Sequence, residues 1–66
     1  MRTEKIEPES AVVELSAEEL EILNNALNEI CHGLDTWDFS IRIGAEKPEV
    51  LRLLHRISET LQAMKR

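Results

Sequence analysis

Apolar residues recur at spacings of three and four along residues 17–33, which is the pattern of an amphipathic helix. At 100° per residue their side chains fall within about 100° of one another, on one face of the helix. Ser16 directly precedes this run and Glu19 follows three residues later, an arrangement typical of a capping box. Gly33 is expected to end the helix with a positive φ. The apolar face consists of Leu20, Leu23, Leu27, Ile30, Cys31 and Leu34.

A second run with the same spacing predicts another helix over about residues 46–65. Pro48 suits the first turn, because the N–H groups there have no partner within the helix. Glu49 near the start and Lys65 near the end both agree with the helix dipole. The apolar face of this helix consists of Val50, Leu53, Leu54, Ile57, Leu61 and Met64.

Residues 34–45, between the two helices, show a different period. Apolar and polar side chains alternate there, which predicts an extended connection with one buried edge. A connection of this length with four apolar side chains is expected to pack over the helices, with the indole N–H of Trp37 bonded to an acceptor. A binding epitope for another protein is the alternative interpretation. The alternating apolar residues are Trp37, Phe39, Ile41 and Ile43.

The first ten residues are rich in charge and interrupted by Pro8, so they predict a disordered or loosely ordered tail. Residues 11–15 are short and rich in β-branched side chains, which suits either a brief strand or a hydrophobic lead-in to the first helix. We expect an extended segment there. Residues 11–66 then form a single helical domain.

The length of the chain limits its core. A chain of 66 residues buries only about 60% of the surface that it exposes when unfolded. Cys31 is the only cysteine, so a disulfide framework cannot add stability. We therefore expect a mainly all-α fold, a hairpin of two amphipathic helices with a packed extended connection, two copies of which dimerise into a four-helix arrangement. The predicted dimer core consists of Leu20, Leu23, Leu27, Ile30, Val50, Leu54, Ile57 and Leu61.

The net charge of −5 is unevenly distributed. Residues 1–29 hold eight glutamates and two basic residues, whereas residues 50–66 hold one glutamate and four basic residues. An acidic chain does not favour phosphate backbones, so we expect no nucleic-acid partner. The sequence holds no apolar run suited to a signal peptide or to a span of about 20 residues. We therefore expect no membrane association and, with a lone cysteine, a cytoplasmic protein.

Residues able to bind metals are scattered without CxxC, HxxxH or HExxH spacing. Cys31 lies on the apolar face and is interpreted as a small core residue, while His32 lies on the polar face. A cysteine nucleophile needs a histidine placed to accept its proton, and neither histidine is so placed. We expect no enzymatic activity, no metal, no cofactor and no small-molecule substrate. The potential ligands are Cys31, His32, Asp35, Asp38 and His55.

Polar residues beside the apolar patterns allow two interpretations each. Asn24 and Asn28 either fix the register of a helix pair or form its polar rim. Arg42 either pairs with an acidic residue of the chain, such as Asp38, or binds an external carboxylate or phosphate. The many acidic residues of the chain favour the internal pair.

The stretch LNNALNEICHG at residues 23–33, followed by Trp37-Asp38-Phe39 and Arg42-Ile43-Gly44-Ala45, resembles a group of short uncharacterised bacterial proteins. These proteins look like two helices joined by a connection. The connection begins with a Trp–acidic–Phe segment and ends with an Arg–hydrophobic–Gly step. The resemblance covers about residues 15–61. It implies a bacterial origin and a compact self-standing unit, and it brings no activity.

By elimination, the sequence favours a small protein-protein interaction or regulatory module that acts as a homodimer. An immunity-like or antitoxin-like neutraliser of a basic effector protein is the alternative, since an acidic protein complements a basic target. An enzyme or a ligand carrier would require a pocket between chains. The residues expected to contact a partner are Trp37, Phe39 and Arg42 in the connection and Glu18, Glu21 and Glu29 on the first helix.

Overall fold

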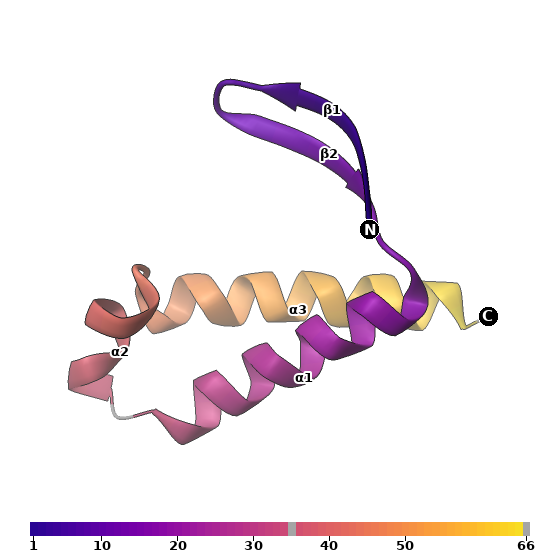
Figure 1. Ribbon diagram of the computed structural model, residues 1–66. Helices are drawn as coiled ribbons and strands as arrows, with labels where there is room; N and C mark the ends of the chain where they lie inside the picture. Colours follow the sequence, from indigo (N-terminus) through magenta and orange to yellow (C-terminus); the bar gives the residue numbers. More distant parts are fainter. Residues whose placement is uncertain (35, 66) are drawn as a thin grey trace.

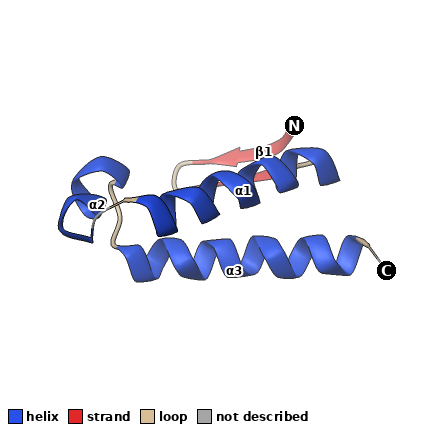
Figure 2. Ribbon diagram, turned by 90° about the horizontal axis from the view of Figure 1, so that it is seen from below, coloured by secondary structure: helices blue, strands red, loops and turns tan. Residues whose placement is uncertain are grey.

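Two long antiparallel helices lie side by side and form the body of the protein (Figures 1 and 2). The structure is a computed structural model that describes residues 1–34 and 36–65. Helix α1 covers Ala17–Gly33 and helix α3 covers Lys47–Met64, and the shorter helix α2, Thr36–Ile43, joins them at one end. Strands β1 (Arg2–Glu7) and β2 (Ser10–Glu14) form a hairpin that precedes α1 and stands clear of the helices.

Helix α1 begins with the capping box that the sequence predicts. The Glu19 N–H donates to the Ser16 hydroxyl at 3.1 Å, and the Ser16 N–H donates to the Glu19 carboxylate at 2.9 Å. Each bond gives a partner to a backbone N–H group that the helix end would otherwise leave without one. The start of α1 is therefore determined by local sequence.

The expected two-helix hairpin with an extended connection is wrong, because a third helix occupies most of that connection. In α2 a step of two residues turns the chain by about 200°, and a step of four returns to within about 40° of the start. Phe39 and Ile43 therefore share one face, which packs inward, while Trp37 and Ile41 share the opposite face. Four alternating apolar residues suit a strand with one buried edge and a short helix with two apolar faces equally well.

The fold also contains an antiparallel two-stranded sheet, so it is not all-α. The tail expected at residues 1–10 contains β1, which pairs with β2 around a turn at Pro8 and Glu9. The paired strands bring Ile6 opposite Ala11 and Thr3 opposite Val13, with a bulge between Thr3 and Lys5. The composition of residues 1–10 concealed this strand, because its stability depends on pairing with a segment further along the chain.

The core lies between α1 and α3 and is closed by α2. Its fully buried members are Cys31 and Phe39, and Val50 from α3 completes the cluster. Leu20 and Leu61 are buried nearer the other end of the helix pair. The partly buried side chains packed on the cluster are Leu27, Ile30, Leu34, Ile43, Ala45 and Leu54.

The four-helix prediction assumed that a second copy covers the apolar faces of the two long helices. This is wrong, because α1 and α3 of the same chain cover each other. Asn24 of α1 accepts a hydrogen bond at 2.6 Å from the Ser58 hydroxyl of α3, a part-buried polar contact between the two helices. Leu23, assigned to the dimer core, stays 40% exposed. The other residues of that predicted core are buried or half-buried within the single chain: Leu20, Leu27, Ile30, Val50, Leu54, Ile57 and Leu61.

Gly44 ends α2 with φ of 82°, and its N–H donates to the Ser40 carbonyl oxygen at 2.8 Å. This is the left-handed conformation that favours glycine after a helix. Gly33 was expected to end α1 with a positive φ; it is the last residue of α1, but it has no positive φ. The turn that depends on glycine is therefore the one between α2 and α3.

We predict opposite effects of alanine at the two glycines. Gly44→Ala meets open space but forces a Cβ into the left-handed region, so it should lower the free energy of unfolding by about 1–2 kcal/mol. Gly33→Ala also meets open space, in a helix, and should raise the free energy of unfolding by about 0.5–1 kcal/mol. Urea unfolding followed by circular dichroism measures both, and equal effects would contradict this account of the turn.

Candidate functional site

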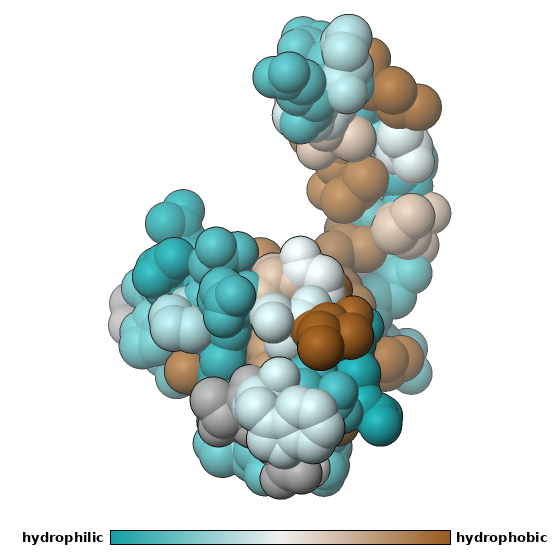
Figure 3. Space-filling view, turned by 90° about the vertical axis from the view of Figure 1, so that its left-hand side faces the viewer, coloured by the Kyte–Doolittle hydropathy of each residue, from teal (hydrophilic) through white to brown (hydrophobic). Residues whose placement is uncertain are grey.

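Helix α2 displays an aromatic and an aliphatic side chain to solvent. Trp37 is 78% exposed and Ile41 is 77% exposed, and they lie one turn apart on the same face. Figure 3 views the molecule from the end where α2 lies and shows brown, hydrophobic surface exposed there beside teal, hydrophilic surface. The opposite face of α2 is anchored by Phe39, which is 1% exposed. The outer face is thus held in place by the core.

A charged pair borders this apolar surface. The Arg42 guanidinium donates to the Asp38 carboxylate one turn away. The predicted Arg42–Asp38 pair is therefore present, in helical rather than extended geometry. Asp38 in the first turn and Arg42 in the last turn both complement the helix dipole. The surface beside Trp37 and Ile41 consequently carries paired charges.

The residues predicted to contact a partner divide into accessible and buried ones. Trp37 was expected to pack over the helices and is instead exposed, so that expectation is wrong. Phe39 is buried in the core, where its ring is inaccessible to a partner. Arg42 is exposed and paired, as just described. Three exposed glutamates lie on α1: Glu18, Glu21 and Glu29.

The exposed glutamates of α1 do not form one dense acidic cluster. Glu18 and Glu29 are eleven positions apart in the helix, which corresponds to about 16 Å along its axis. Glu21 pairs at 3.4 Å with Lys65, the residue directly after α3. This acidic face is therefore less concentrated than the sequence count suggests.

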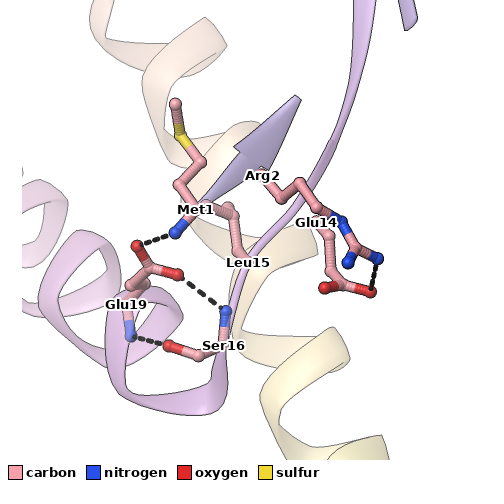
Figure 4. Close-up of a pocket in the computed structure, with 6 residues that line it drawn as sticks. All are labelled: Met1, Arg2, Glu14, Leu15, Ser16 and Glu19. Carbon is pink, nitrogen blue, oxygen red and sulfur yellow. Dashed lines mark hydrogen bonds and ion pairs between the residues drawn. The ribbon is translucent and has the colours of Figure 1, made fainter. Parts of the chain in front are cut away.

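A pocket of about 320 Å³ lies where the hairpin joins α1 (Figure 4). The Met1 ammonium donates to the Glu19 carboxylate, and Arg2 pairs with Glu14 at 3.2 Å. The Met1 ammonium, followed by the hydrogen bond from the Ser16 N–H, lowers the pKa of Glu19. The Glu19 carboxylate therefore caps α1 and also binds the Met1 ammonium. Both groups have a structural role here.

Residues that carry catalytic or metal chemistry elsewhere are dispersed in this fold. Cys31 is fully buried, while His32 is exposed with its Nδ1 atom 2.7 Å from the Asn28 carbonyl oxygen. His55 is exposed on α3. Within residues 1–34 and 36–65, no three His, Cys, Asp or Glu side chains gather as metal ligands would. Asp35 lies outside the described residues.

Comparison of the chain with protein-family models, with curated proteins and with solved structures finds no match. The resemblance to short bacterial proteins stays a prediction. Among the helices described, none has the length and apolar character needed to cross a bilayer. The candidate functional site therefore rests on the exposed surface of the fold itself.

We predict that Glu19 makes stability depend on pH. A carboxyl group whose pKa is lowered on folding stabilises the protein above the ordinary glutamate pKa of about 4.3. This contribution is lost as the pH falls through the lower pKa of the folded state. Urea unfolding between about pH 7 and pH 3 should show a shallower acid loss for Glu19→Gln than for wild type. Glu29→Gln on the same helix is the control, and an identical pH dependence of all three proteins would contradict the role of Glu19.

We also predict that the two aromatic residues of α2 differ sharply in their effect on stability. Phe39→Ala removes a fully buried ring and should cost about 3–5 kcal/mol. Trp37→Ala removes an exposed ring and should change the free energy of unfolding by less than about 0.5 kcal/mol. Thermal and urea unfolding compare the two variants. A large loss with Trp37→Ala would mean that its ring is buried in the folded protein.

Proposed function

We propose that this protein is a small, non-enzymatic interaction module that acts as a homodimer and binds another protein through the exposed face of α2. The proposed contact residues are Trp37 and Ile41, with Arg42 at their edge. Nucleic acid, membranes and small-molecule substrates are not part of this function. The buried, free thiol of Cys31 supports a location in the reducing cytoplasm.

The observation that supports partner binding is the opposition of the two faces of α2. The inner face, with Phe39 and Ile43, holds the helix against the core. The outer face presents an indole and a branched aliphatic chain on a helix that the core already holds in place. Binding to a preorganised helix face costs little conformational entropy, and tryptophan is enriched among residues that dominate interface energetics.

Neutralisation of a basic effector protein is less well supported. It would use the glutamates of α1, which are spread along the helix and of which Glu21 is paired with Lys65. Paired and dispersed surface charges steer encounters but contribute little affinity. The apolar face of α2 provides the better contact surface.

The accessible surface of the chain supports association. It amounts to 5446 Å², about 1,100 Å² more than the area expected for a compact monomer of this size. A standard protein interface buries about 800 Å² on each partner. The chain therefore exposes enough excess surface for an interface with a second copy.

The test compares capture of proteins from a lysate of the native host by immobilised wild-type protein and by Trp37→Ser/Ile41→Ser. Leu53→Ser is the matched control, because Leu53 is also an exposed apolar residue on a helix. Quantitative mass spectrometry should show the same partner with wild type and the control, and a loss of about tenfold or more with the α2 variant. In the purified complex the tryptophan emission should move to shorter wavelength. Capture that is unaffected by the α2 changes would overturn the proposal.

A further inference from the structure

The hairpin has one charged face and one apolar face. In paired strands, successive side chains alternate between the two faces, and cross-strand partners share a face. The ion pairs Arg2–Glu4, Arg2–Glu14 and Lys5–Glu7 therefore lie on one face, together with Val12, which is opposite Lys5. The other face carries Thr3, Ile6, Ala11 and Val13.

The apolar face of the hairpin continues onto α1. Met1 and Leu15 adjoin the strand ends and line a pocket of about 230 Å³ with Glu19, Ile22 and Leu23 of α1. Both Ile22 and Leu23 are exposed. The hairpin apolar surface is defined here as this continuous region: Met1, Thr3, Ile6, Ala11, Val13, Leu15, Ile22 and Leu23.

Nothing within the described residues covers this surface. Every residue of both strands is exposed, and the helices of the chain pack on one another rather than on the hairpin. Figure 3 shows the hairpin standing away from the helical body with apolar atoms in the open. An isolated two-stranded hairpin is marginally stable in water and needs further strands or a packed surface. Contact with a partner on the apolar face would therefore stabilise the hairpin.

The occupant that fits this surface is a second copy of the chain. The excess exposed area is of the size that a dimer interface buries, as shown above. Two acidic chains repel each other unless their charges stay apart or are paired. The strand residues of the hairpin apolar surface carry no charge, and the Met1 ammonium at its edge is paired with the Glu19 carboxylate. The ion-paired face remains directed to solvent.

We propose that two copies of the protein associate through their hairpin apolar surfaces, in a two-fold interface where each copy covers the hairpin of the other. A two-fold interface uses the same patch twice, so one self-complementary apolar surface is sufficient to build it. This inference rests on the proposed homodimer and names its surface. It leaves α2, at the other end of the helix pair, free to bind a different protein.

The test uses neighbouring residues that differ in the face they occupy. Val13→Lys places a charge on the hairpin apolar surface, whereas Val12→Lys places the same charge on the ion-paired face. The two variants have identical composition and net charge. Sedimentation velocity of the full chain over a range of concentrations should give a dimer for wild type and Val12→Lys. Val13→Lys should raise the dimer dissociation constant by about tenfold or more, and Ile6→Lys should do the same.

Hydrogen exchange of the wild-type protein distinguishes loss of the interface from loss of the hairpin fold. Strand amides in residues 3–13 should be protected at concentrations where the dimer forms and should lose protection on dilution, while α1 and α3 stay protected. A dimer that Val13→Lys and Ile6→Lys leave unchanged overturns this inference but retains the proposed homodimer. A wild-type monomer at all concentrations overturns both. Partner capture through α2 is measured separately with the Trp37 and Ile41 variants, so it is judged independently.

Discussion

The packing of α1 against α3, closed at one end by Phe39 of α2, is the interaction on which the rest of the structure depends. A chain of 66 residues has few apolar side chains to bury, and the largest that is fully buried is Phe39. Its ring lies with Cys31 and Val50, one residue from each long helix. This single cluster holds the three helices together, and it also orients α2. Since Phe39 and Ile43 must face inward, Trp37 and Ile41 must face solvent.

The geometry of the helix pair separates two exposed apolar surfaces. Helices α1 and α3 are antiparallel, so the hairpin is joined to the pair at the start of α1, at the end opposite α2, and its strands run back above the middle of the pair (Figure 1). The proposed partner surface on α2 and the proposed dimer surface on the hairpin can therefore be occupied together. A dimer of this kind presents two copies of α2, which raises the effective concentration for a partner with two matching sites.

Several exposed ion pairs of the protein border these surfaces. Arg42–Asp38 borders the exposed face of α2, and pairs of Arg2 and Lys5 with glutamates occupy one face of the hairpin. Such exposed pairs contribute little stability individually. Their arrangement is still informative, because charges gathered on one side of the hairpin leave the other side apolar.

Local sequence determined the elements whose stability comes from neighbouring residues. Ser16 and Glu19 are three positions apart, so the capping box at the start of α1 was predictable, and the spacing of three and four placed apolar faces on α1 and α3. The Arg42–Asp38 pair was predictable as a pair because Asp38 is close in sequence, although its geometry was not.

In α2 the alternation of four apolar residues was compatible with a strand and with a helix exposed on one side, and only packing of Phe39 into the core selects the helix. The hairpin could not be found from residues 1–10 alone, because β1 is stabilised by β2. Periodicity likewise identifies which face of a helix is apolar but not what covers it. The tertiary structure decided that α1 and α3 of one chain cover each other, because the connection through α2 reverses the chain and brings them together.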